Sequence, residues 1–460
     1  MANPNNMNKS ETIFALSSAA GKAGVSIIRV SGMHAWHSLE KLLNNQSLPT
    51  PRKTKLAKLT NPNNKQIIDN AMVIGFKSPN SFTGEDVIEY HCHGSPAIIQ
   101  EMLDVLGAMN EHRLADHGEF TRRAFLNGQM DLTEAEAIAD LIDAETKMQK
   151  EQALLQMGGA LSTLYHDWAG RLTKALAYVE TIIDFPDEDV PDEQIAEAKP
   201  AVEKLTQEID AHLNDNRKGE RLREGIQIAL IGAPNAGKSS LVNLLAQRDV
   251  AIVSDMAGTT RDVVEAHLNL GGYPVIISDT AGLRPNQIGS SEQDKIESEG
   301  IKRALQKAKE ADIKILLFDA SDETAHQETL DLLDENALIL LNKTDLLNGD
   351  DISFHVKQNI QKFEISIKDN KNIDGFLAEL TKMIAEKFAV SRETPSLTKN
   401  RHRQHLTEAQ EFLSNCLTQA QPELMAQDLR FAVNALGRIT GRVDVEDLLD
   451  VIFKDFCIGK

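Results

Sequence analysis

The segment Gly232-Ala-Pro-Asn-Ala-Gly237-Lys238-Ser239 limits the possible folds of this chain more than any other feature of its sequence. It follows an apolar run, Ile226–Ile231, typical of a buried strand, and it precedes Ser240–Gln247, which has the composition of a helix. In such a setting the glycines let the backbone wrap around phosphate oxygens, and the N–H groups at the helix start point inward. The pattern predicts a nucleotide-binding P-loop, with Lys238 at the β- and γ-phosphates and the Ser239 hydroxyl on magnesium.

Three further segments follow the P-loop in the order typical of a GTP-binding domain. Gly258-Thr-Thr260-Arg-Asp262 can place Thr260 on magnesium and the γ-phosphate. Ile276-Ile-Ser-Asp279-Thr-Ala-Gly282 can place Asp279 near the metal and the Gly282 N–H at the γ-phosphate. Asn342-Lys343-Thr344-Asp345 ends the apolar run Leu338–Leu341, and the Asp345 carboxylate can accept hydrogen bonds from N1–H and the 2-amino group of guanine. Adenine lacks both donors, so we predict GTP as the ligand.

The residue that follows this Asp-Thr-Ala-Gly turn is informative for a different reason. Many regulatory GTPases place a glutamine there to orient the attacking water, whereas this chain has Leu283. A leucine side chain cannot hydrogen-bond to water, so another group must take that role.

The remaining sequence predicts two other kinds of structure. Residues 1–125 mix short β-like runs with turns, which indicates an α+β domain. Residues 126–222 and 386–460 are helical in composition, with a capping box expected at Thr133 and Glu136. Strands and helices alternate in residues 223–385. We therefore predict an α/β P-loop GTPase domain at 223–385, inserted in an all-α domain made of 126–222 and 386–460.

Composition adds weaker constraints. The 460 residues carry a formal net charge of −20, which argues against a surface covered by basic patches but does not exclude a local RNA-binding cluster. The three cysteines are widely spaced, as in proteins with free thiols. The first ten residues are polar, and no apolar run reaches the length of a membrane span. We expect a cytoplasmic protein.

Several strings outside the P-loop resemble the bacterial tRNA-modification GTPases of the MnmE (TrmE) family. They extend over nearly the whole chain and end in a highly specific tail. They are Ser81-Phe-Thr-Gly-Glu-Asp86, Gly118-Glu-Phe-Thr121, Arg123-Ala-Phe-Leu-Asn127, Phe185-Pro-Asp-Glu188, Gly258-Thr-Thr-Arg-Asp262 and Cys457-Ile-Gly-Lys460.

This resemblance implies a folate-binding N-terminal domain and potassium-dependent GTP hydrolysis in a homodimer, with two GTPase domains meeting face to face. It also implies an FAD-dependent partner of the MnmG type. Together the two proteins would attach an aminomethyl or carboxymethylaminomethyl group to C5 of the wobble uridine in certain tRNAs, with tetrahydrofolate carrying the one-carbon unit. The alternative is a ribosome-associated, RNA-binding GTPase switch without one-carbon chemistry.

The resemblance also implies roles for individual residues. Glu297 is the best match to the water-orienting glutamate, with Glu292 and Glu299 as alternatives. Potassium would be held by Asn235, Ser254, Met256 and Thr259, and magnesium by Ser239 and Thr260. The nucleotide contacts expected are Asn235, Ala236, Gly237, Lys238, Ser239, Ser240, Ser254, Asp255, Met256, Ala257, Gly258, Thr259, Thr260, Asp279, Thr280, Ala281, Gly282, Asn342, Lys343, Thr344 and Asp345.

Folate contacts are implied at Arg29, Glu89 and Lys460, and Gln129 stands where the family is expected to have lysine. Cys457 is a candidate nucleophile or acid at the one-carbon centre; the alternative is a thiol packed beside Phe453 and Phe456. His91 and His93 share one face of an expected strand, but a metal site there lacks a visible fourth ligand.

Overall fold

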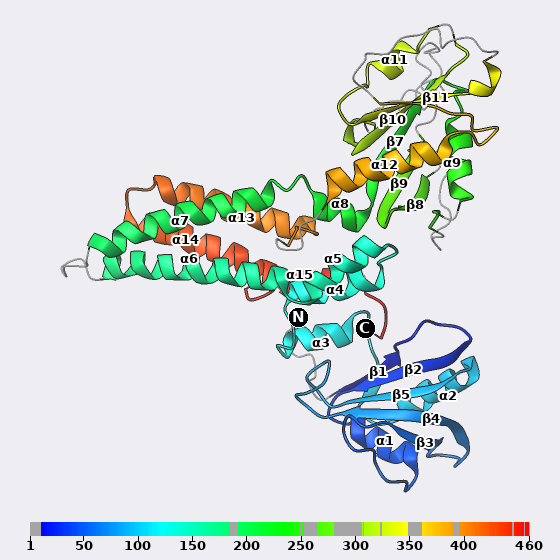
Figure 1. Ribbon diagram of the computed structural model, residues 1–460. Helices are drawn as coiled ribbons and strands as arrows, with labels where there is room; N and C mark the ends of the chain where they lie inside the picture. Colours follow the sequence, from blue (N-terminus) through cyan, green and yellow to red (C-terminus); the bar gives the residue numbers. More distant parts are fainter. Residues whose placement is uncertain are drawn as a thin grey trace, which may run out of the picture. The chain divides into compact units, whose positions relative to one another are not determined.

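The computed structural model describes residues 11–184, 192–248, 250–252, 265–279, 306, 308–322, 324–347, 361–389, 395–443, 446–454 and 456–459 (Figure 1). The contacts divide the chain into two compact units. The first unit contains residues 1–139, 156–201 and 415–460, and the second contains 140–155 and 202–414. Among the described helices, none is both long enough and apolar enough to cross a membrane.

The N-terminal part of the first unit is a six-stranded sheet in the order β3-β4-β5-β2-β1-β6. Its pairs are antiparallel except for β1 and β6, which run parallel. The elements are β1 (Thr12–Leu16), β2 (Ala23–Ser31), α1 (Ala35–Leu43), β3 (Lys55–Thr60), β4 (Ile67–Phe76), β5 (Val87–Gly94), α2 (Pro96–Gly107), β6 (His112–Leu114) and α3 (Glu119–Leu126).

The two faces of this sheet differ in what covers them. One face packs on α1 and α2 through a large apolar core that includes Phe14, Leu39, Tyr90 and Met102. On the other face a smaller cluster joins Ile13 and Ala15 of β1 to Phe120 of α3. Because alternate strand residues point to opposite faces, Arg29, Glu89 and His91 lie on the face that α3 only partly covers.

Helices make up most of the rest of the first unit. α6 (Ala160–Asp184), α14 (Pro422–Thr440) and α15 (Glu446–Lys454) lie wholly in the first unit. Four helices have residues in both units: α4 (Leu132–Ile142), mostly in the first, and α5 (Lys147–Met157), α7 (Asp192–Leu213) and α13 (Asn400–Thr418), mostly in the second. α6 and α14 lie alongside each other, and an ion pair of 2.7 Å joins Arg430 to Glu180 (Figure 1).

The start of α4 corrects one expectation. Asp131 precedes the helix, its Oδ1 accepts the Glu134 N–H at 3.0 Å, and Glu134 Oε2 accepts the Asp131 N–H at 2.8 Å. The capping box therefore consists of Asp131 and Glu134, and the prediction of Thr133 and Glu136 was wrong. Both of those residues lie inside the helix and are buried. An aspartate two residues earlier accepts the orphan N–H, so the helix begins sooner.

The second unit contains a six-stranded sheet in the order β12-β11-β10-β7-β9-β8, parallel except for the edge strand β8. Its elements are α8 (Lys218–Glu224), β7 (Ile226–Gly232), α9 (Lys238–Ala246), β8 (Glu265–Leu270), β9 (Tyr273–Asp279), β10 (Ile313–Asp319), α11 (Gln327–Leu330), β11 (Ala337–Asn342), η1 (Thr344–Leu346), β12 (Lys362–Glu364) and α12 (Ile373–Phe388).

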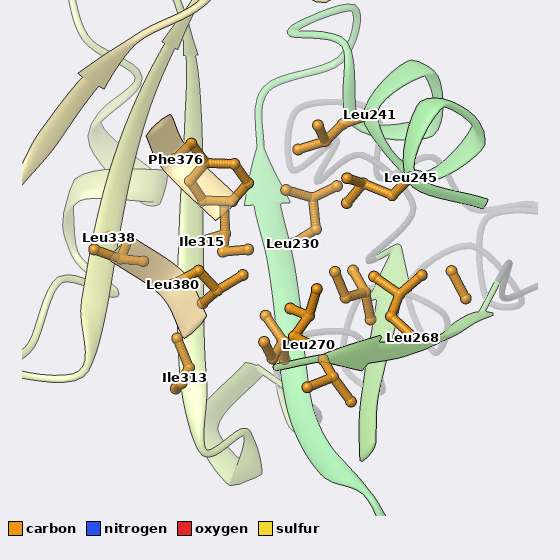
Figure 2. Packing of buried hydrophobic residues seen from close by; sticks show 14 of the residues in the cluster. Leu230, Leu241, Leu245, Leu268, Leu270, Ile313, Ile315, Leu338, Phe376 and Leu380 are labelled. Atoms are coloured by element: carbon orange, nitrogen blue, oxygen red, sulfur yellow. The ribbon is translucent and has the colours of Figure 1, made fainter. Parts of the chain in front are cut away.

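Apolar side chains cover both faces of this sheet. On one face, Leu241 and Leu245 of α9 and Phe376 and Leu380 of α12 pack on Leu230 and its neighbours (Figure 2). The opposite face forms a second core, which includes Ile231, Leu316 and Ile339. Parallel strands buried on both faces place their carboxyl ends along one edge, where ligands of α/β folds bind.

Candidate functional site

The P-loop connects the end of β7 to the start of α9, as the sequence predicts. Asn235 and Gly237 both adopt positive φ, at 66° and 109°. A methyl group at Gly237 would lie 2.4 Å from Asn342 Nδ2, so a side chain larger than hydrogen does not fit there. The Lys238 ammonium donates to the carbonyl oxygens of Gly232 at 2.9 Å and Ala233 at 3.0 Å. These contacts place a positive charge inside the turn of the loop.

The remaining described residues of the P-loop have different exposures. Asn235, Ser239 and Ser240 are exposed, whereas Ala236 is buried. Ser239 and Ser240 belong to the first turn of α9, where the N–H groups of a helix start and the helix dipole favour an anion. This arrangement fits the chemistry of a phosphate chain: a cation, a helix start and a backbone without bulky side chains.

The segment Asn342–Asp345 begins at the carboxyl end of β11 and meets the P-loop directly. Asn342 is 4% exposed, and its Nδ2 donates to the Ala236 carbonyl at 2.8 Å. Its Oδ1 accepts the Ile367 N–H at 3.1 Å, and Thr344 Oγ1 donates to the Ile365 carbonyl at 3.0 Å. The structure therefore brings together the phosphate loop and the segment predicted to select guanine.

Two side chains that the sequence analysis did not single out complete this corner. Ser366 Oγ donates to Asp345 Oδ1 at 2.7 Å, and Asp319 Oδ2 accepts the Lys343 ammonium at 2.6 Å. Ser366 lies just beyond β12, and Asp319 ends β10. The sequence does show that polar residues follow the apolar runs that end near Asp319 and Ser366. Predicting that these residues contact segment 342–345, however, requires knowing the order of the strands in the sheet.

Many of the predicted nucleotide and metal contacts lie outside the described residues. They are Ser254, Asp255, Met256, Ala257, Gly258, Thr259, Thr260, Thr280, Ala281, Gly282 and the candidates Glu292, Glu297 and Glu299. The backbone of Asp279 ends β9, as expected, beside the strand that leads into the P-loop.

A second cluster of candidates lies on the N-terminal sheet. Arg29 on β2 and Glu89 on β5 are register partners, and Arg29 Nε and Nη2 each lie 3.0 Å from Glu89 Oε1. The two side chains are 17% and 18% exposed. The Arg29 guanidinium lies 5.4 Å from the ring centroid of Phe82 and 5.7 Å from that of Phe120. The expected folate contacts Arg29 and Glu89 therefore lie together, but they pair with each other.

The loop that carries Phe82 is held by partly buried polar contacts. Ser31 Oγ donates to Glu85 Oε2 at 2.7 Å, Arg123 Nη1 lies 3.1 Å from the same oxygen, and Asn127 Nδ2 donates to the Thr83 carbonyl at 2.7 Å. Gln129 lies beside this loop, because a methyl group at Gly84 would be 3.0 Å from its Nε2. Segments 81–86 and 123–127, which are far apart in the sequence, therefore contact each other next to Arg29.

Glu119, the first residue of α3, is a buried carboxylate with two arginine partners. Glu119 is 2% exposed and accepts from Arg113 at 2.6 Å and from Arg123 at 3.0 Å. Burial alone would raise the pKa of Glu119, but hydrogen bonds from Arg113 and the Asp116 N–H, with the charge of Arg123, lower it below its ordinary value. The network keeps a carboxylate ionised inside the fold.

The C-terminal tail docks on this same unit. His117 Nδ1 lies 2.9 Å from the Phe456 carbonyl oxygen, and the Gly118 N–H donates to the Cys457 carbonyl at 3.4 Å. Ser17 Oγ, just after β1, donates to the Gly459 carbonyl at 2.9 Å. The Cys457 side chain is exposed, so it is not the packed thiol considered as an alternative. Lys460 lies outside the described residues.

His91 and its neighbours do not form one ligand set. Cys92 packs in the core on the opposite face of β5 from the two histidines. His93 Nδ1 contacts Asp69 Oδ1 at 2.8 Å, whereas His91 Nε2 lies 3.5 Å from Glu89 Oε2. His91 Nε2 is a buried atom without a hydrogen-bond partner among the described residues, next to the Arg29–Glu89 pair.

The parallel sheet, the P-loop and the 342–345 segment define the second unit as a GTPase of the P-loop class. Family models match almost the whole chain: "GTP-binding protein TrmE N-terminus" over residues 12–129 and "MnmE helical domain" over residues 132–457. The chain belongs to the MnmE family of tRNA-modification GTPases, in which a P-loop domain is inserted in a helical domain that follows an α+β N-terminal domain.

Sequence relatives agree with this assignment. A protein from Rickettsia bellii called "tRNA modification GTPase MnmE" is 49% identical over 452 residues, which cover 98% of this chain and 100% of the relative. A Rickettsia akari protein of the same name is 46% identical over the same coverage.

Among solved structures, Aquifex aeolicus Era bound to GDP.AlF4- is 22% identical over 43% of this chain and 69% of its own, with a TM-score of 0.27.

Proposed function

We propose that this protein hydrolyses GTP in a potassium-dependent reaction and couples it to modification of the wobble uridine in certain tRNAs. With an FAD-dependent partner of the MnmG type, it would add an aminomethyl or carboxymethylaminomethyl group at C5. The observation that carries the GTPase part is the hydrogen bond from Asn342 to Ala236, because it joins a phosphate cradle and a base-recognition segment in one site. We also propose three domains: an N-terminal domain at residues 1–125, a helical domain made of 126–222 and 386–460, and a GTPase domain at 223–385.

Each residue of the site has a distinct task in this proposal. Lys238 offsets phosphate charge, and the backbone of 235–240 wraps the phosphate oxygens. Ser239 and Thr260 hold magnesium, and Asn235, Ser254, Met256 and Thr259 hold potassium. When bound, the two cations supply positive charge where the transition state builds up negative charge. Glu297 orients the attacking water that Leu283 cannot contact.

Guanine selection is assigned to Asp345. Its carboxylate accepts from N1–H and the 2-amino group, while Ser366 donates to Oδ1 and limits its rotation. Replacing Asp345 with asparagine exchanges one acceptor for a donor, which suits a 2-oxo purine better than guanine. Asp345→Asn should therefore lose GTP affinity and gain affinity for xanthosine triphosphate. Unchanged preference for GTP would contradict the role of Asp345.

The N-terminal unit is proposed to bind a tetrahydrofolate derivative, which supplies the one-carbon unit. Arg29 and Glu89 fit such a ligand, since a half-buried ion pair offers both an anion partner and an acceptor for pterin N–H groups. The buried His91 Nε2 supplies a further polar atom at the same place. Cys457, held by the tail contacts to His117 and Ser17, provides an exposed thiol on this unit, with Lys460 as a further folate contact.

Four measurements test the proposal. Phosphate release by the purified full chain should be much faster in potassium than in sodium buffer; equal rates would contradict the potassium role. Mass analysis of tRNA from cells in which Cys457→Ser replaces the wild-type protein should show loss of the C5 modification, while GTP turnover in vitro is largely retained. Failure of the protein to bind tetrahydrofolate saturably would instead favour a ribosome-associated GTPase switch. Analytical ultracentrifugation with GTP in potassium buffer tests the proposed homodimer.

A further inference from the structure

The β3–β4 hairpin of the N-terminal sheet carries a charge opposite to that of the chain as a whole. Residues 52–77, here called the basic hairpin, contain six lysines and arginines and one aspartate, in a chain whose formal net charge is −20. All six cationic side chains are exposed except that of Lys55, which is partly buried. They are Arg52, Lys53, Lys55, Lys58, Lys65 and Lys77.

Carboxylates offset little of this charge. Asp69, the one acidic residue of the hairpin, is 8% exposed. Its Oδ2 accepts the His93 N–H at 2.8 Å, and its Oδ1 lies 2.8 Å from His93 Nδ1. This carboxylate is therefore engaged with β5 rather than with a lysine. Among the described residues, Lys77 alone of the six cations has an acidic partner, Asp86 at 3.1 Å.

The other five cations keep their full charge. Arg52 and Lys55 donate to neutral groups, a backbone carbonyl and a serine hydroxyl. The ammonium groups of the remaining three form no hydrogen bond or ion pair with any residue that the structure describes; these are Lys53, Lys58 and Lys65. The basic hairpin is therefore a local concentration of positive charge that an anionic partner can neutralise.

The placement of these side chains exceeds what an edge strand needs. β3 is the edge of its sheet (Figure 1), and a lysine such as Lys58 can protect an edge from pairing with another chain. Lys53 and Lys65, however, lie in the chain before and after β3, where there is no strand edge to protect. The six residues of β3 span about 20 Å at about 3.3 Å each, so the charges extend along the whole hairpin.

Two large apolar side chains lie open to solvent among these charges. Leu56 and Met72 are register partners on β3 and β4, and they are 75% and 42% exposed. Lys58, two residues after Leu56, points to the same face. The surface thus combines apolar contact area with unneutralised cations, a mixture that suits the bases and phosphates of an unpaired nucleic acid strand.

We propose that the basic hairpin is a tRNA-binding surface: its lysines contact consecutive backbone phosphates, while Leu56 and Met72 contact the sugar or base of an unpaired nucleotide. Each phosphate neutralised by lysine releases bound counterions, which favours association. The acidic remainder of the chain repels a polyanion, so the charge distribution directs tRNA to this hairpin. The choice of tRNA as the polyanion rests on the proposed function in tRNA modification.

The salt dependence of tRNA affinity tests the inference. Fluorescence anisotropy with the full-length protein and a labelled, unmodified tRNA transcript gives the affinity at several potassium chloride concentrations. The triple variant Lys53→Gln/Lys58→Gln/Lys65→Gln should bind at least about tenfold more weakly at 0.1 M salt, and its log–log salt slope should be smaller by about two to three. Leu56→Ser should lose affinity severalfold with an unchanged slope, because the contact that it removes is not ionic. GTP turnover without tRNA should stay at the wild-type rate in both.

The matched control removes three exposed lysines from α6, α7 and α12, as Lys174→Gln/Lys204→Gln/Lys382→Gln, with the same change in net charge. It should bind tRNA within about twofold of wild type. Wild-type affinity and slope in the hairpin variant, or an equal loss in the control, would overturn the role of the hairpin alone. Absence of tRNA binding by the wild-type protein would instead overturn the proposed function. A hairpin variant that loses affinity only because its oligomeric state has changed, measured by analytical ultracentrifugation, would assign the surface to a protein partner and also overturn the inference.

Discussion

Asn342, the last residue of β11, donates a hydrogen bond of 2.8 Å to the carbonyl oxygen of Ala236 in the P-loop. The same amide accepts the Ile367 N–H through its oxygen. One buried side chain thus connects three loops at the carboxyl edge of the sheet. A nucleotide that contacts the P-loop with its phosphates and Asp345 with its base spans the segments that Asn342 holds together.

Replacing Asn342 with alanine should weaken GTP binding by roughly tenfold to a hundredfold. The substitution leaves the buried Ala236 carbonyl and the partly buried Ile367 N–H without their partner, and an unsatisfied buried group costs about 1–3 kcal/mol. Isothermal titration with GDP measures the effect. Gln327→Ala, which removes an exposed amide on α11, is the control and should bind normally. Wild-type affinity of Asn342→Ala would show that the three loops keep their arrangement without this contact.

Arg29→Ala should abolish most of the affinity for tetrahydrofolate, since it removes the cation and leaves the Glu89 carboxylate half-buried without its partner. Arg29→Lys should recover only part of it, because an ammonium cannot reproduce the contacts of the planar guanidinium with the Phe82 and Phe120 rings. Equilibrium dialysis of the full chain measures both. Arg52→Ala, at an exposed arginine of the same unit, should bind as wild type. Undiminished binding by Arg29→Ala would remove the basis for a folate site at this pair.

The three thiols should differ sharply in reactivity. Burial raises the pKa of Cys92 to about 12 and that of Cys416 to about 11, whereas Cys457 is exposed. Since the thiolate is the reactive form, iodoacetamide at pH 8 should label the native protein once, at Cys457. Peptide mass analysis identifies the site, and Cys457→Ser should take up almost no label. Labelling of Cys92 at a comparable rate would mean that the N-terminal core opens easily.

The P-loop and the Asn342–Asp345 segment could be predicted from the sequence alone, because each is encoded by a short, continuous stretch of residues. An apolar run followed by a glycine-rich turn and a helix lies within about twenty residues, so β7, the P-loop and α9 appear almost where expected. Asn342–Asp345 ends β11 for the same reason. Competing local signals cause small errors: at α4 the aspartate at 131 begins the helix two residues before the expected threonine.

Nonlocal pairs could not be predicted in this way. Arg29 faces Glu89 only because β2 and β5 are neighbours in a particular register, and a shift of one residue would place them on opposite faces. Asp319 reaches Lys343 because β10 and β11 are adjacent. The exposure of Cys457 depends on how the tail meets His117 and Ser17. Such contacts depend on strand order and packing, which cannot be deduced from a short stretch of sequence.

The pH dependence of stability should contain a contribution from His212, near the end of α7. Burial lowers its pKa to about 4, with Arg403 and His402 acting in the same direction and Asp215 opposing it. Below pH 6.5 the unfolded chain takes up a proton that the folded chain does not, so stability falls as pH drops toward 4. At pH 5 the loss relative to pH 7.5 should be about 2 kcal/mol. His212→Gln cannot titrate, so urea unfolding of this variant should show a smaller fall between these two pH values. An equal fall in both proteins would mean that His212 remains accessible to protons in the folded state.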